Sequence, residues 1–224
     1  MSIRSHEQVA LLTDYDANSA YSEAFRTLYA NIRFNWNSEK DRLLTLLITT
    51  PASFAGHTAA AANTAIVAAQ SGTSVILVDA DLREPGLEQR FGVGQHQGLS
   101  DLLEEEEITP QKVASCLQQT FIPGLRLLGA GSKSGPAELL HLTRLEAVFS
   151  GIRSLLAEET APAIVIFHSA PVLLGADASI LAALVEQTLL VLAKNRTTRA
   201  QAKQAQEQLE RVHAHLAGVI LLDI

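Results

Sequence analysis

The sequence is poor in cysteine, in aromatic residues and in positive charge. Cys116 is the single cysteine among 224 residues, which excludes an intrachain disulfide and a zinc site built from several thiolates. Lys and Arg number 17 against 24 Asp and Glu, and the net charge of −7 offers no basic surface to a nucleic-acid backbone. We therefore expect a cytoplasmic protein of a reducing compartment that does not bind nucleic acid.

The sequence also lacks an uninterrupted hydrophobic run long enough to cross a membrane. Its longest apolar tract, 161–185, is broken by Pro171 and Asp177, as is typical of a buried strand, a loop and a helix start. With 47% hydrophobic and 18% charged residues, the chain can bury a large core. We expect a single soluble domain over residues 1–224.

Short apolar runs alternate with helical patterns along the chain. Hydrophobicity within each run is continuous, which indicates strands covered on both faces and hence a mostly parallel sheet. The expected strands are residues 43–50, 74–79, 125–128, 163–167, 188–193 and 218–222. The expected helices are residues 22–34, 58–70, 110–117, 143–157, 177–185 and 198–215. This order predicts an α/β fold, a doubly wound and mostly parallel sheet with helices on both faces.

Polar segments follow three of the expected strands. They are residues 51–58 after the first strand, 79–85 after the second and 168–173 after the fourth. In a doubly wound sheet, ligands bind beyond the carboxyl ends of the strands. We expect these three segments to converge at one edge of the sheet and to form the site.

Six short motifs follow one another along the chain. The most specific is Val-Asp-Ala-Asp-Leu-Arg-Glu-Pro at 78–85, and the others lie at 22–34, 98–103, 135–140, 170–173 and 196–199. In this order they resemble motifs of the bacterial tyrosine kinases of capsular and exopolysaccharide synthesis, a group of P-loop ATPases with deviant Walker motifs. The resemblance implies a P-loop NTPase-like fold, with an N-terminal oligomerisation helix over about residues 19–36.

The loop after the first strand departs from the family's Gly-Glu-Gly-Lys-Ser/Thr. The same places hold Phe54, Ala55, Gly56, His57 and Thr58. Phe54 stands where a glycine permits close approach of a phosphate, and His57 stands where a lysine neutralises the β- and γ-phosphates. Imidazole is shorter than the lysine side chain and mostly neutral at pH 7. The resemblance therefore implies that the main phosphate clamp is missing.

Two further departures affect the nucleotide site that the resemblance implies. His168 stands where the family has an Asp that engages magnesium, an ion that prefers oxygen ligands. Leu222 stands where the last strand usually ends in an Asn close to the base, and because the chain ends at Ile224 we expect no tyrosine-rich tail. Phosphoryl transfer depends on neutralising charge, so we expect no catalytic residues. The vestigial nucleotide-binding positions are Phe54, Gly56, His57, Thr58, His168 and Leu222.

The second acidic motif keeps Asp79, Asp81 and Arg83, which are residual candidates for a nucleotide or metal site. The alternative is that they cap helices and stabilise the fold. The two histidines open another possibility, because His57 and His168 together with Asp79 and Asp81 make up a recognised type of transition-metal ligand set. Here the alternative is that two unconstrained positions have drifted to histidine.

The N-terminal helix carries a variant of the family's association pattern. Family members associate through Glu-x-x-Arg-x-x-Arg, and this chain has Glu23, Arg26 and Tyr29 at the three places. We expect no ring of the family's type, whereas a dimer or a mixed oligomer stays open.

These features predict a catalytically degenerate tyrosine-kinase-like protein that needs no cofactor and acts by protein contacts in exopolysaccharide or capsule biosynthesis and export. The resemblance implies a membrane-anchored polysaccharide chain-length regulator or an active paralogue as partner, which would bring the chain to the inner face of the membrane. The alternative is an active ATP-dependent protein tyrosine autokinase or ATPase that regulates chain length, with ATP and magnesium as cofactors and Arg83 or Lys133 as the clamp.

Overall fold

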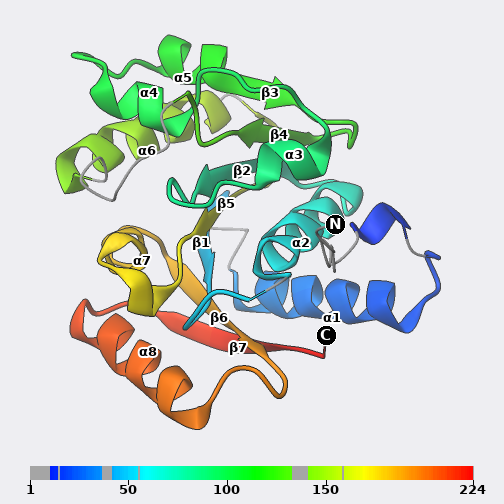
Figure 1. Cartoon of the computed structure of the whole chain (residues 1–224). Helices are drawn as coiled ribbons and strands as arrows, with labels where there is room; N and C mark the ends of the chain where they lie inside the picture. Colours follow the sequence, from blue (N-terminus) through cyan, green and yellow to red (C-terminus); the bar gives the residue numbers. More distant parts are fainter. Residues whose placement is uncertain are drawn as a thin grey trace, which may run out of the picture.

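One sheet organises the chain in the computed structural model, which describes residues 11–14, 16–36, 42–54, 56–132, 141–157 and 159–223. The strands within these residues are β1 (Leu43–Thr49), β2 (Ser74–Ala80), β3 (Leu117–Gln119), β4 (Leu125–Leu128), β5 (Ala163–Ser169), β6 (Gln187–Ala193) and β7 (Leu216–Leu222). They lie in the order β3-β4-β2-β5-β1-β6-β7 (Figure 1). All neighbours pair in parallel except β3 and β4, which are antiparallel.

Helices cover both faces of this sheet. The helices are α1 (Ala20–Asn35), α2 (His57–Gln70), α3 (Leu87–Phe91), α4 (Leu99–Glu104), α5 (Pro110–Cys116), α6 (Leu142–Leu156), α7 (Asp177–Ala182) and α8 (Arg199–Arg211), with 3-10 turns at Leu12–Asp14 and Val172–Leu174. Helices α1, α2 and α3 contribute to one buried cluster, and α4 to α8 contribute to a second cluster on the opposite face (Figure 1). The predicted α/β fold, doubly wound around a mostly parallel sheet, is confirmed.

The structure adds three short elements to the predicted set and shortens two helices. Strand β3 and helices α3 and α4 have only three to six residues, too few to produce a recognisable hydrophobic period. Helix α7 ends at Ala182, before the predicted 185. Helix α8 ends at Arg211, before 215, because the chain turns through a left-handed conformation at His213 (φ 56°) and enters β7 two residues early. The motif at 135–140 lies outside the described residues.

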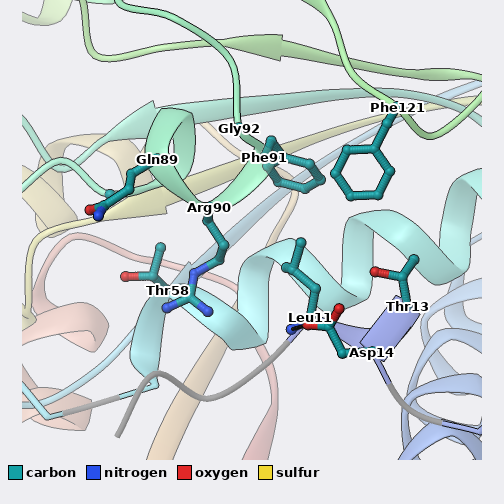
Figure 2. Close-up of a pocket in the computed structure, with 10 residues that line it drawn as sticks. Leu11, Thr13, Asp14, Thr58, Gln89, Arg90, Phe91, Gly92 and Phe121 are labelled. Atoms are coloured by element: carbon teal, nitrogen blue, oxygen red, sulfur yellow. Dashed lines mark hydrogen bonds between the residues drawn. The ribbon is translucent and has the colours of Figure 1, made fainter. Parts of the chain in front are cut away.

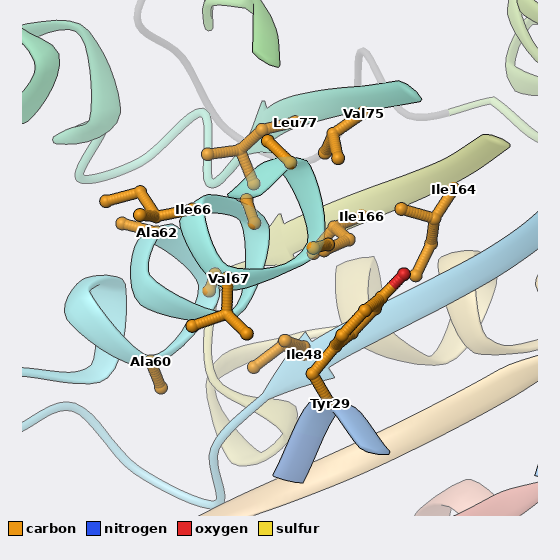
Figure 3. Close-up of a cluster of buried hydrophobic side chains, with 14 of the residues drawn as sticks. Tyr29, Ile48, Ala60, Ala62, Ile66, Val67, Val75, Leu77, Ile164 and Ile166 are labelled. Carbon is orange, nitrogen blue, oxygen red and sulfur yellow. The ribbon is translucent and has the colours of Figure 1, made fainter. Parts of the chain in front are cut away.

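Helix α2 lies between α1 and the sheet and has almost no solvent-exposed face. Of its 14 residues, 12 are buried, most of them alanine. Small side chains let the helix approach β2 and β5 closely, and Figure 3 shows Ile66 and Val67 among side chains of those strands and of α1. The helix begins after Gly56, whose φ of 97° favours glycine. This tight packing sets the position of His57, the first residue of α2.

None of the described helices combines the length and the apolar character needed to cross a membrane.

The second cluster offers a direct test of the packing. The rings of Phe149 and Phe167 stack with centroids 4.4 Å apart, and Phe167 is fully buried. We expect Phe167→Ala to lower the free energy of unfolding by about 3–5 kcal/mol, measured by urea denaturation, because the cavity cannot close completely. The control is Phe34→Ala on α1, where the side chain is 91% exposed and the change should stay within about 0.5 kcal/mol. Equal losses in the two variants would contradict this packing.

Candidate functional site

Three neighbouring strands bring the candidate segments together. In the order β2-β5-β1, His168 of β5 pairs with Asp79 of β2 on one side and with Ile48 of β1 on the other. The strands are parallel, so the segments that follow β1 and β2 lie at the same edge as the end of β5. The predicted convergence at one sheet edge is therefore what this topology produces.

The side chain of His57, at the start of α2, points into the protein. His57 Nδ1 donates a hydrogen bond of 2.8 Å to the carbonyl of Phe54, and the two rings are 6.0 Å apart, edge to face. Phe54 packs against the first buried cluster, and the side chain of His57 is only 12% exposed. The remaining ring nitrogen, Nε2, is buried without a hydrogen-bond partner. The imidazole is thus held by its own loop and directed into the protein.

His57, Asp81 and His168 form one compact group. One ligand atom from each residue lies within 4.8 Å of the others, and His57 Nε2 is 3.9 Å from Asp81 Oδ2. The two imidazole rings have centroids 5.1 Å apart. His168 is 1% exposed, and neither of its ring nitrogens has a hydrogen-bond partner among the described residues. The structure therefore brings together three of the four residues that the sequence suggested as metal ligands.

Burial and mutual proximity shift the pKa values of these three side chains. Burial, followed by the nearby His57, lowers the pKa of His168 to about 3, so that this imidazole is neutral near pH 7. Burial also lowers the pKa of His57, but the nearby carboxylate of Asp81 and the hydrogen bond to the carbonyl of Phe54 outweigh it and raise the pKa overall. Burial raises the pKa of Asp81, yet the nearby His57 and the hydrogen bond donated by the amide of Glu84 hold it below its usual value.

Asp79, the fourth suggested ligand, faces the start of α3 instead. Its Oδ2 accepts backbone hydrogen bonds from Gly86 and Leu87, each of 2.9 Å, and its Oδ1 accepts one of 3.3 Å from Asp81. Complete burial raises the pKa of Asp79 to about 7, against the lowering effect of those amides. Its carboxyl group joins the turn after β2 to α3, which is the structural role that the sequence left open.

Arg83 forms an ion pair with Asp177, a residue that the sequence analysis had noted only as the start of a helix. Its Nε donates a hydrogen bond of 2.9 Å to Oδ2 of Asp177, the first residue of α7, whose side chain is 5% exposed. The only sequence signal was the position of Asp177 shortly after the motif at 170–173. Lys133, the other cation considered as a clamp, lies outside the described residues.

A cavity of about 720 Å³ lies beside the start of α2, between α2, α3 and the N-terminal turn (Figure 2). Of the site residues suggested by the sequence, only Thr58 lines it among the described residues, opposite Arg90 and Phe91 of α3. The cavity therefore adjoins the group of His57, Asp81 and His168 but is not formed by it. Leu222, at the end of β7, lies two strands away from β1 and pairs with Ala193.

The three positions of the association pattern do not share one exposed face. Glu23 and Arg26 are exposed and form an ion pair with each other. Tyr29 is 4% exposed and turned into the core, where its hydroxyl bonds the side chain of Thr73 (Figure 3). A surface on α1 that includes Glu23 and Arg26 cannot include the side chain of Tyr29.

The chain is similar in sequence to tyrosine-protein kinases and in fold to a cell division ATPase. It is 32% identical to the tyrosine-protein kinase YwqD of Bacillus subtilis (strain 168) over 221 residues, 97% of this chain and 86% of that protein. The crystal structure of the chimerical protein CapA2B2 matches with a TM-score of 0.77 at 28% identity, over 94% of this chain and 88% of that one. The cell division ATPase MinD of Pyrococcus furiosus has the same fold, with a TM-score of 0.61 at 22% identity over 80% of this chain and 71% of its own. No family model matches the chain.

The structural role of Asp79 can be tested by two substitutions. We expect Asp79→Ala to lower the free energy of unfolding by on the order of 2 kcal/mol, because it leaves the buried amides of Gly86 and Leu87 without an acceptor. Asp79→Asn keeps an amide oxygen for them and should cost less than about 1 kcal/mol. Urea denaturation of both variants measures the difference, and equal losses would count against this cap.

Proposed function

The chain belongs to the bacterial tyrosine kinases of capsule and exopolysaccharide synthesis, as its motifs indicated, and on this basis we propose that it is a catalytically degenerate member that acts through protein contacts in polysaccharide biosynthesis and export. The single observation that carries the proposal is the inward-folded His57. A lysine at that place would reach out to a phosphate, whereas this imidazole bonds the carbonyl of Phe54 and points toward Asp81 and His168.

The residues at the site do not fit magnesium and a nucleoside triphosphate. His168 presents two nitrogen atoms in a buried place where a magnesium ion calls for carboxylate oxygens. Phe54 adds a ring to the loop whose backbone would approach the phosphates. The lysine and the carboxylate that the family uses for phosphoryl transfer are therefore both replaced by imidazoles in this chain.

The competing function, an active autokinase or ATPase, needs another cation at the phosphates. Arg83, the described one of the two cations that the sequence suggested, has its Nε bonded to the buried carboxylate of Asp177. Release of that bond would leave Asp177 buried with neither of its oxygens bonded, since its Oδ1 already lacks a partner. This cost favours the degenerate member over the active one.

Two exposed apolar features support a role in protein contacts. Phe34 at the end of α1 is 91% exposed, and Val219 and Leu221 of the edge strand β7 are 55% and 64% exposed on one face. Large exposed apolar side chains grouped on an edge strand are typical of surfaces that meet another protein. The partner we propose is the family's membrane-anchored chain-length regulator or an active paralogue, with a dimer or mixed oligomer formed through α1.

Nucleotide binding tests the proposal. We expect the melting temperature of the wild-type chain to be the same with and without magnesium ATP. A ligand at a hundredfold its dissociation constant would stabilise the fold by about 2.7 kcal/mol, which thermal denaturation detects readily. We expect no phosphotyrosine to form under the same conditions.

A restored variant provides the positive control. The combination of Phe54→Gly, His57→Lys and His168→Asp returns the glycine, the cation and the carboxylate that the loop and β5 lack. We expect this variant to gain a stabilising shift with magnesium ATP, and the same variant without His57→Lys to gain less. A shift in the wild-type chain as large as in the restored one would contradict the proposal.

A further inference from the structure

Three unrelated elements direct ligand atoms toward one point. His57 comes from the start of α2, Asp81 directly follows β2, and His168 lies near the end of β5. Their nearest nitrogen and oxygen atoms all lie within 4.8 Å of one another. No other group of three or more histidine, cysteine or acidic residues with such geometry occurs in the described part of the chain.

Three of the four ring nitrogens of the two imidazoles lack hydrogen-bond partners among the described residues. His57 Nε2 and both ring nitrogens of His168 are buried without one, and His168 is almost completely inaccessible. Nearly all buried polar atoms in folded proteins are paired, so three orphaned nitrogens in one place point to a missing partner. A single ligand placed among them would contact two imidazoles and one carboxylate at once.

Hydrogen bonds to the backbone orient the side chains of His57 and Asp81, so that His57 Nε2 and Asp81 Oδ2 face each other. His57 Nδ1–H donates to the carbonyl of Phe54, which leaves the lone pair of Nε2 on the side of Asp81. This is the usual arrangement of a metal-bound histidine, whose second nitrogen donates to a backbone carbonyl. Asp81 Oδ1 accepts from the amides of Arg83 and Glu84, and Oδ2, the oxygen facing His57, is left for another ligand.

We propose that His57, Asp81 and His168 bind one divalent transition-metal ion of the zinc type. Two imidazoles and a carboxylate suit such ions, whereas magnesium and calcium prefer oxygen ligands. Three protein ligands leave a fourth tetrahedral position for a water molecule or an external donor.

Binding of a zinc-type ion requires the three ligand atoms, which lie within 4.8 Å of one another, to come closer together. Zinc takes nitrogen and oxygen ligands at about 2.0–2.2 Å, which places two tetrahedral ligands about 3.3–3.5 Å apart. His57 Nε2 and Asp81 Oδ2 are 3.9 Å apart. His57 is the most exposed of the three side chains, so an ion can enter beside its ring.

The metal site goes beyond the proposed function and stands apart from it. Loss of nucleotide binding requires only that the lysine and the carboxylate are gone, and it needs no metal. If no metal binds, the nucleotide-binding experiment still tests the proposed function. If magnesium ATP shifts the melting temperature, the cobalt titration and its ligand variants still test the metal site.

Cobalt(II) is the probe for this site. The full chain, without a histidine tag and freed of metal by a chelator, is titrated with Co²⁺ alone. We expect one equivalent to bind and to give the visible absorption of four-coordinate cobalt, which Zn²⁺ then displaces. We also expect Zn²⁺ to raise the melting temperature of the wild-type chain.

Two variants remove ligands and one serves as the matched control. His57→Ala removes the most exposed ligand, and Asp81→Asn removes the anionic ligand while it keeps an oxygen for the amides of Arg83 and Glu84. Each should weaken Co²⁺ binding by at least about tenfold. His96→Ala removes an exposed histidine that is not part of the group and should leave the affinity unchanged. Circular dichroism verifies that each variant is folded.

Three results would overturn the proposal. They are no Co²⁺ absorption in the wild-type chain, wild-type affinity in folded His57→Ala and Asp81→Asn, or an equal loss in His96→Ala. A loss confined to the two ligand variants supports it.

Discussion

Parallel pairing of β5 with β2 on one side and β1 on the other is the constraint on which the site depends. Hydrogen bonds between these strands fix the register of His168 against Asp79 and Ile48. The ends of the strands then bring α2, the turn after β2 and β5 to one place, although His57 and His168 are more than a hundred positions apart in sequence. The tight packing of the alanine-rich α2 adds the second constraint, because it sets where His57 begins the helix.

Burial disfavours the charged forms of two ionisable side chains at this edge of the sheet. Burial holds His168 neutral, with a pKa of about 3, and raises the pKa of Asp79 to about 7. The contacts of His57 with Asp81 and of Arg83 with Asp177 favour charged pairs. A triphosphate with magnesium needs concentrated charge of both signs, whereas a transition metal is served by neutral imidazoles and one carboxylate.

Long, strongly patterned segments were predictable, and short ones were not. All six predicted strands exist because a run of buried apolar residues is visible whatever surrounds it. Strand β3 owes its existence to pairing with Arg126, Leu127 and Leu128 of β4, a contact made after the chain has turned. Helix α3 begins where Asp79 accepts two backbone amides, so its start depends on a residue of the preceding strand.

The sequence by itself determined the alternation of strands and helices, the family resemblance and the presence of two histidines where a cation and a carboxylate were expected. Only the tertiary structure decided which partner each polar side chain has. Asp79 accepts hydrogen bonds at the start of α3, Asp81 lies beside the two histidines, and Arg83 binds Asp177. The tertiary structure also decided that Tyr29 is buried, on the side of α1 that meets the core. The physical reason is that hydrophobic periodicity is local, whereas a buried polar atom finds its partner among side chains brought near only by the packing of distant segments.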